Sequence, residues 1–300
     1  MGNRLETAGV KLSEIGLGIE HFARHSHVPG LTRDESSEQI IQEAYRSGIT
    51  HYDLVFNLPY FFDIFREFMH TKRNKITFTH HMGSFYNEKR SGHVKTRSLK
   101  KIAYTFEDML ERLNTDYVDI SLIQFVTHYE DFEKCIKSGI VDYAMQLKEE
   151  NKAKAIGLSA HKPALLSKII SKIDLDVIML PINFATGWRP ELKQLLTSCK
   201  KKGIGVIAIK NLLKGKAFTT KKSNYSAYYC AGSKFSMKLD KAATPADCIN
   251  YALDLGIDSV VFGVKKVDEL RKNVESFRAS KDSKEYTYFE QLFKQTIESL

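Results

Sequence analysis

Eight short apolar segments, each followed by a longer stretch with helical spacing of its apolar residues, recur along the 300-residue chain. The first ends at Gly16 and Gly18, and the others cover residues 49–55, 76–79, 118–123, 155–159, 177–180, 205–209 and 259–262. Strands that alternate with helices are typical of a parallel sheet. Eight such units predict an α/β fold, a closed (β/α)8 TIM barrel with its active face at the C-terminal ends of the strands. An open, doubly wound sheet is the structural alternative.

The helical stretches carry recognisable start and stop signals. We predict helices over residues 36–47, 60–70, 98–113, 130–150 (broken near Gly139), 190–202 and 267–278, with further helices after Pro163 and after Thr244-Pro245. Residues 4–18 predict a hairpin that closes the barrel bottom, and residues 284–298 predict a C-terminal capping helix. Residues 82–96 and 211–243 are expected to be loops, and loops of such length are usually functional. We therefore expect residues 1–300 to form a single barrel domain.

Charge and cysteine usage limit the classes of partner. The chain has 45 Lys and Arg against 36 Asp and Glu, and 45 − 36 gives a net charge of +9. The basic residues are scattered, which indicates solvated faces and a phosphate-bearing cofactor rather than a nucleic-acid or membrane surface. The cysteines lie far apart without a CxxC pair, and the N-terminus lacks an apolar signal core. We therefore expect a reducing, cytoplasmic setting and a small-molecule substrate.

Five segments in order carry a resemblance to a known family. Residues 48–53 run from a turn glycine along a strand to Asp53, and residues 263–266 form a Gly-Val-Lys-Lys loop followed by Asn273. The other segments are residues 4–18, 116–120 and 154–159. Together they resemble the aldo-keto reductase family over nearly the whole chain.

The resemblance implies hydride transfer between NADPH and a carbonyl group. In that family a tyrosine is the acid, a lysine and an aspartate tune its pKa, and a histidine orients the carbonyl. Asp53 matches the aspartate, whereas the tyrosine position is Leu58, so Tyr60 is the nearest substitute. His80 stands for the lysine and Gln124 for the histidine. The predicted catalytic set is thus Asp53, Tyr60, His80 and Gln124, with Tyr60 or His80 as the acid.

The same resemblance implies NADP or NAD as the cofactor. The residues expected to bind it are Ser159, Asn183, Lys210, Gly263, Lys265, Lys266 and Asn273. A lysine at the position of Lys210 is also found in some iron–sulfur relatives, whose cysteine cluster is absent here. Glu269 stands where many NADPH-dependent members carry arginine, which leaves NAD and NADP both open.

The histidines offer a different interpretation of the same barrel. His21, His80, His81 and His161 follow strands one, three and five, and Glu20 and Asp53 join them at the predicted active face. Such a set is suited to zinc, iron or manganese, or to acid–base chemistry. The favoured hypothesis is an NAD(P)-dependent oxidoreductase for a small carbonyl or sugar-like substrate. The alternatives are a lyase or isomerase that uses the histidine cluster, and a non-catalytic binding protein.

Overall fold

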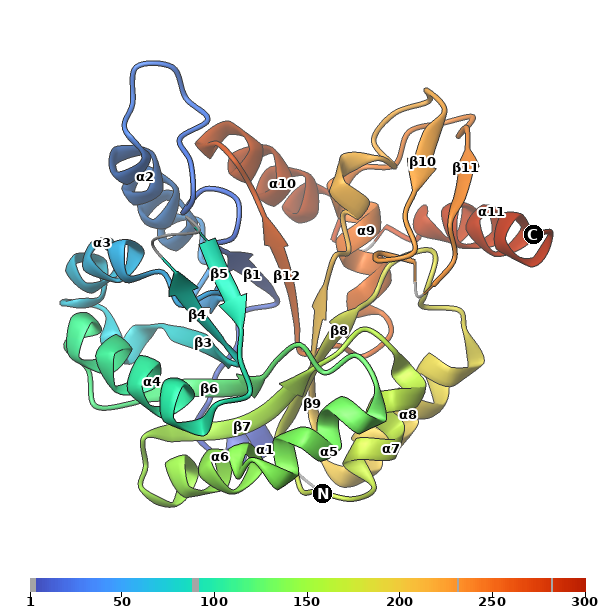
Figure 1. Ribbon diagram of the computed structural model, residues 1–300. Helices are drawn as coiled ribbons and strands as arrows, with labels where there is room; N and C mark the ends of the chain where they lie inside the picture. Colours follow the sequence, from blue (N-terminus) through green and yellow to red (C-terminus); the bar gives the residue numbers. More distant parts are fainter. Residues whose placement is uncertain (1–3, 88–91, 231, 282) are drawn as a thin grey trace.

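Figure 1 shows the computed structural model of the chain, which describes residues 4–87, 92–230, 232–281 and 283–300. Eight parallel strands form a closed barrel in the order β1-β12-β9-β8-β7-β6-β3-β2. Their bounds are β1 Ile15–Gly18, β2 His51–Leu54, β3 Thr77–Met82, β6 Val118–Ile123, β7 Ala153–Ser159, β8 Val177–Pro181, β9 Gly205–Ile209 and β12 Ser259–Gly263. Because β1 pairs with both β2 and β12, the predicted barrel is confirmed and the open sheet is excluded.

Helices surround the barrel and follow its strands (Figure 1). Their bounds are α2 Arg33–Arg46, α3 Pro59–Met69, α4 Leu99–Leu113, α5 Tyr129–Lys137, α6 Ile140–Glu149, α7 Pro163–Ile170, α8 Pro190–Lys202, α9 Pro245–Leu253, α10 Val267–Ala279 and α11 Tyr286–Glu298. Thr244 caps α9 in a capping box with Asp247, as its sequence predicts. The predicted break at Gly139 is confirmed, because this residue has φ of 73° between α5 and α6. No helix in the described ranges is long and apolar enough to cross a membrane.

Two apolar layers result from the alternation of side chains along the strands. Ile120, Leu122, Val177 and Ile207 fill the barrel interior together with neighbouring strand residues. A second layer between the strands and the helices contains aromatic side chains such as Phe78. A residue's position along its strand therefore decides whether its side chain points into the barrel or toward the helices.

The N-terminal hairpin prediction is wrong, because residues Arg4–Thr7 form the single helical turn α1. The amide of Val10 donates to the carbonyl of Leu5 and that of Gly9 to the carbonyl of Glu6, which is the Schellman pattern, and Gly9 has φ of 71°. This turn brings Leu5 and Val10 together in the apolar cluster at the barrel interior. The bottom is thus closed by a helical turn, because one glycine-terminated turn buries both apolar residues.

Both segments predicted as loops contain an antiparallel hairpin. Strands β4 (Ser84–Asn87) and β5 (Gly92–Lys95) pair with each other, as do β10 (Ser223–Tyr225) and β11 (Phe235–Met237). The second hairpin contributes Tyr225 to a satellite core, where its ring lies 5.0 Å from that of Phe293 in α11. The C-terminal helix therefore packs against this hairpin, against α9 and against Phe184 shortly after β8.

Candidate active site

A buried pair of side chains joins the C-terminal ends of β2 and β3. Asp53 and His81 are 4% and 2% exposed, and Nε2 of His81 lies 2.6 Å from Oδ1 of Asp53. Asp53 is in register with Thr79, so His81 follows two residues further along the same face of β3. The strand alternation therefore directs both side chains into the barrel mouth. Nδ1 of His81 is buried and has no hydrogen-bond partner among the described residues.

A polar layer lies directly below this pair. His51 is fully buried, with Nδ1 at 2.9 Å from Oγ of Ser259 and Nε2 at 2.9 Å from Oγ1 of Thr79. Burial lowers the pKa of His51 to about 4, so the ring is neutral near pH 7. Gly16 leaves room for it, since a Cβ there would lie 2.8 Å from Nδ1 of His51. His51 is thus a structural histidine that links three strands.

His80 is separated from Asp53 by the same alternation. Its side chain points toward α4, with its ring 5.2 Å from the ring of Phe106 in that helix. Its Nδ1 lies 3.0 Å from Oγ of Ser121 in the neighbouring strand β6. Burial lowers the pKa of His80 to about 3. The prediction that β3 ends before the histidines is wrong, because the strand continues to Met82. His81, not His80, consequently meets Asp53. The period of two along the strand separates the two histidines in the sequence, and the register with β2 decides which of them faces the mouth.

Tyr60 makes its described contacts away from the Asp53–His81 pair. The guanidinium of Arg33 lies 3.9 Å from its ring centre, and the ring of Tyr86 lies 5.6 Å away. Burial raises the pKa of Tyr60, although Arg33 opposes this. These contacts do not prepare the phenol as an acid near neutral pH, and Leu58, at the expected tyrosine position, is 1% exposed.

Gln124 lies beside the pair and anchors the β4–β5 hairpin. Its Nε2 donates to Oγ of Ser84, the first residue of β4, at 2.9 Å. The side-chain amide of Asn57, after β2, donates to the carbonyl of Ser84 at 2.9 Å. The first residue of the hairpin is therefore hydrogen-bonded to the two segments that follow β2 and β6. Gln124 thus helps to hold the β4–β5 hairpin in place at the mouth of the barrel.

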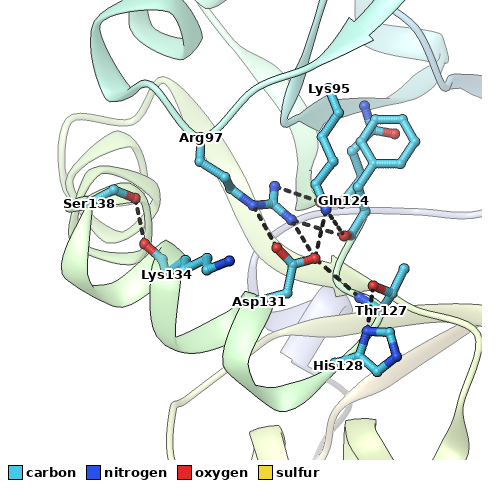
Figure 2. A network of polar contacts seen from close by, with 9 residues as sticks. Lys95, Arg97, Gln124, Thr127, His128, Asp131, Lys134 and Ser138 are labelled. Carbon is cyan, nitrogen blue, oxygen red and sulfur yellow. Dashed lines mark hydrogen bonds and ion pairs between the residues drawn. The ribbon is translucent and has the colours of Figure 1, made fainter.

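Figure 2 shows the network that holds the other end of this hairpin. Lys95 and Arg97 both contact Asp131 at the start of α5, at 2.7 and 3.3 Å. The same two cations donate to the carbonyl of Phe125 at 3.1 and 2.9 Å. Phe125 has φ of 61°, an unusual value for a bulky residue, which such contacts must stabilise. The ring of His93 from β5 stacks on Phe125 at a centroid distance of 6.1 Å.

A second polar cluster occupies the other side of the mouth. Nζ of Lys210, directly after β9, lies 2.6 Å from Nε2 of His161, which follows β7. The amide of Asn183 donates to the carbonyl of Lys210 at 3.2 Å and to that of Tyr229 at 3.0 Å. Asn183 is 1% exposed, so it positions backbone rather than presenting a free amide. Ser159 lies at the end of β7, partly exposed.

The loop after β12 leads into the N-terminus of α10. Lys265 is exposed, and Lys266 is the N-cap residue without a side-chain cap. The carboxylate of Glu269 accepts from the amide of Lys265 at 2.8 Å. Gly263 allows a close approach, since a Cβ there would lie 2.9 Å from Cδ2 of His21, and Asn273 is 8% exposed. The N-terminus of α10 therefore combines exposed lysines with acidic residues in the first helical turn.

A hollow of about 720 Å³ lies between α2 and α10, beside that N-terminus. Lys266, Asp268 and Arg271 line it from α10, and Glu43 lines it from α2. It is polar and open at the outer edge of the barrel, so it is separate from the Asp53–His81 pair.

The histidines do not converge on one point. His80 points toward α4, His81 pairs with Asp53, and His161 contacts Lys210. Within the described ranges, no group of three or more His, Cys, Asp or Glu side chains is arranged to hold a metal ion. The residues present therefore do not fit the shared metal site that the sequence offered as an alternative.

The sequence model of the Aldo/keto reductase family matches residues 14–294. The chain belongs to the aldo-keto reductase family. L-galactose dehydrogenase of Arabidopsis thaliana is 25% identical over 292 residues, which cover 90% of this chain and 86% of that protein. L-glyceraldehyde 3-phosphate reductase of Escherichia coli (strain K12) is 25% identical over 221 residues, covering 69% of this chain and 60% of that protein.

Solved structures share the fold. The holo form of aldo-keto reductase AKR11C1 from Bacillus halodurans has a TM-score of 0.72 at 18% identity, covering 94% of this chain and 92% of that one. Glycerol dehydrogenase AKR11B4 from Gluconobacter oxydans has a TM-score of 0.68 at 17% identity, covering 96% and 92%. This aldo-keto reductase thus has the barrel fold of its structural relatives, and in its mouth Asp53 contacts His81.

Proposed function

We propose that this aldo-keto reductase is an NAD(P)-dependent oxidoreductase that interconverts a small, sugar-like carbonyl compound and its alcohol. The observation that carries the proposal is the buried contact of 2.6 Å between His81 and Asp53 at the C-terminal mouth of the barrel. Active sites of TIM barrels lie at this face. The sugar-like class is supported by the similar proteins named L-galactose dehydrogenase and L-glyceraldehyde 3-phosphate reductase.

In this proposal His81 is the acid and base. We assign its Nε2 proton to the contact with Asp53, because the carboxylate can only accept. Asp53 then fixes the ring orientation and stabilises the imidazolium. Nδ1 makes no hydrogen bond to the described residues, so in this proposal it is the atom that gives a proton to a carbonyl oxygen or takes one from a hydroxyl. We propose this role for His81 in place of Tyr60 or His80.

We propose that the residues after β12 bind the dinucleotide. The first-turn amides of α10 and the exposed Lys265 and Lys266 favour an anion such as a pyrophosphate. Gly263 permits close backbone approach, while Asn273 and Ser159 offer hydrogen-bonding side chains. When bound, the nicotinamide dinucleotide supplies or accepts the hydride. We propose that Gln124 shapes the substrate side of the mouth, since its contact with Ser84 holds the hairpin there.

The test is a fluorescence titration with NADH and with NADPH, followed by turnover on a panel of aldoses and small polyols. We expect saturable binding of at least one cofactor and turnover that Asp53→Asn abolishes without loss of cofactor binding. No binding of either cofactor at millimolar concentration would overturn the proposal. Turnover that persists unchanged in Asp53→Asn would overturn the role of the pair. Cofactor binding without turnover on any carbonyl would favour the non-catalytic alternative.

We also propose that residues 1–300 act as one barrel domain in a reducing, cytoplasmic setting. Cys135, Cys199, Cys230 and Cys248 are all free and buried, as is ordinary in a compartment that keeps thiols reduced. Digestion with limiting protease would test the domain proposal, since two independently stable fragments would contradict it.

A further inference from the structure

A partly buried lysine without a carboxylate partner lies across the mouth from Asp53. Nζ of Lys210 is 2.6 Å from Nε2 of His161 and 3.4 Å from the ring centre of Tyr228. Within the described part of the chain, no carboxylate lies within ion-pair distance of this amine. Buried ammonium groups are costly unless they are paired. Lys210 therefore has an imidazole and an aromatic ring as its partners, and no carboxylate fixes its charge.

The surrounding charges agree with this description. Burial is the main cause that lowers the pKa of Lys210 to about 7, with Glu20 opposing it and the charge of Lys214 adding to it. Burial and the charge of Lys210 lower the pKa of His161 to about 4. Near pH 7 the imidazole is therefore neutral, and about half of the lysine is the free amine. Tyr228 and Tyr229 complete the set of titratable groups around it.

The backbone holds this amine in place at some cost. Lys210 has φ of 59°, in the left-handed region that a long side chain seldom adopts. The side chain of Asn183 secures the conformation by donating to the carbonyls of Lys210 and Tyr229, and its Oδ1 accepts from the amide of Ala185 at 3.0 Å. A strained backbone conformation persists only where surrounding contacts hold it in place, and such conformations are common at functional sites.

We propose that Lys210 is an imine-forming amine for a small aldehyde that carries an anionic group, with His161 as its proton-transfer partner. The neutral Nζ adds to the carbonyl carbon, and one Nζ proton moves to the carbonyl oxygen through Nε2 of His161. The hydroxyl of this carbinolamine then leaves as water with the second Nζ proton, and the C=N bond forms. The products are the imine and one water molecule, with no oxidant or reductant required.

The preference for an anionic aldehyde comes from the cations nearby. Burial and the charges of Lys214 and Lys265 lower the pKa of His21, whereas Glu20 raises it, so two ammonium groups act against one carboxylate around this ring. A carboxylate or phosphate on the aldehyde would be attracted there. The site is also distinct from the Asp53–His81 pair, because β12 and β1 separate β9 from β2 in the barrel.

The test uses glyoxylate with sodium cyanoborohydride at pH 7, without nicotinamide cofactor, followed by peptide mapping by mass spectrometry. Lys100, an exposed lysine of α4, is the internal control in the same molecule. A fall in pKa from about 10.4 to about 7 raises the free-amine fraction on the order of a thousandfold at neutral pH. Since a less basic amine is less nucleophilic, we expect N-carboxymethylation of Lys210 to be at least about tenfold faster than that of Lys100.

Three further measurements complete the test. The labelling rate of Lys210 should rise with a midpoint near pH 7, and His161→Phe should slow it about tenfold at pH 7 while circular dichroism stays unchanged. Glycolaldehyde, which is neutral, should label Lys210 several-fold more slowly than glyoxylate, relative to Lys100. Labelling of Lys210 no faster than Lys100 would overturn the proposal, and equal relative rates for the two aldehydes would overturn its anionic preference. Because no cofactor is present, these outcomes are independent of the oxidoreductase proposal.

Discussion

Nε2 of His81 lies 2.6 Å from Oδ1 of Asp53, although 28 residues separate the two in the sequence. Adjacent parallel strands with matched register bring them together at the barrel mouth. His80, one residue earlier, lies on the opposite face of β3 against Phe106. Two neighbouring histidines of one strand thus have unrelated surroundings, and the difference can be measured.

His81→Gln and His80→Gln form a matched pair of variants. His81→Gln should lower kcat/KM by roughly 10²- to 10⁴-fold, because it removes the proposed acid and base, with little change in cofactor affinity. His80→Gln should leave kcat/KM near its original value and lower the free energy of unfolding by about 1–3 kcal/mol, since it disturbs a buried contact with Ser121. Steady-state kinetics and urea unfolding measure the two effects. The reverse pattern would show that the acid lies elsewhere.

Glu269→Arg should change the preference between the two cofactors. Glu269 places a carboxylate at the N-terminus of α10, where it accepts from the amide of Lys265 and would repel an added phosphate. Its replacement by arginine should improve the affinity for NADPH relative to NADH by about tenfold, as a charge-assisted contact would. Glu275→Arg, an exposed change of the same charge further along α10, is the control. An equal change in both variants would indicate net charge rather than a local contact.

Asp131→Asn should weaken the hairpin network in a pH-dependent way. Burial raises the pKa of Asp131, but hydrogen bonds from Lys95 and Arg97 outweigh this and hold it below the ordinary value of 3.8. The folded state therefore favours the carboxylate, so its stabilisation is fully present above about pH 5 and is lost as the pH falls through the folded-state pKa. The difference in free energy of unfolding between the original chain and Asp131→Asn should shrink in acid.

Glu133→Gln is the control for that series, because it neutralises an exposed carboxylate on the same helix. Urea unfolding between pH 3 and pH 7 (about the range over which an Asp carboxylate titrates) gives the comparison. A difference for Asp131→Asn that does not depend on pH would show that the network acts through packing alone.

Gly157→Ala should destabilise the barrel strongly. A Cβ at Gly157 would overlap the carbonyl oxygen of Val177 and lie 2.6 Å from Cδ2 of Leu122, where neither the strand nor the packed interior can yield easily. Overpacking of this kind costs about 1–3 kcal/mol or more. Gly18→Ala, in another barrel strand, meets its nearest atom at 3.4 Å and should cost less than about 1 kcal/mol. Thermal unfolding of both variants checks the contrast, and equal losses would contradict it.

Local patterns in the sequence specify the architecture of the barrel. Eight apolar segments alternating with amphipathic ones specify eight strands and their helices, because each pattern buries its apolar residues in only one kind of element. Caps such as Thr244 and breaks such as Gly139 are local signals, and the structure confirms them. The apolar pattern around Gly9 failed because a Schellman turn and a hairpin both use a positive-φ glycine between apolar residues.

The polar contacts of the mouth follow from the packing of the whole barrel. The sequence placed Asp53, His80, His81 and His161 near one rim, but the choice of His81 over His80 depends on strand parity and register. The contact between Lys210 and His161 depends on the strand order, which places only β8 between β9 and β7. Local propensity fixes elements over a few residues, whereas pairings between distant strands follow from packing the whole barrel. The chemistry of the site therefore depends on pairings between distant strands.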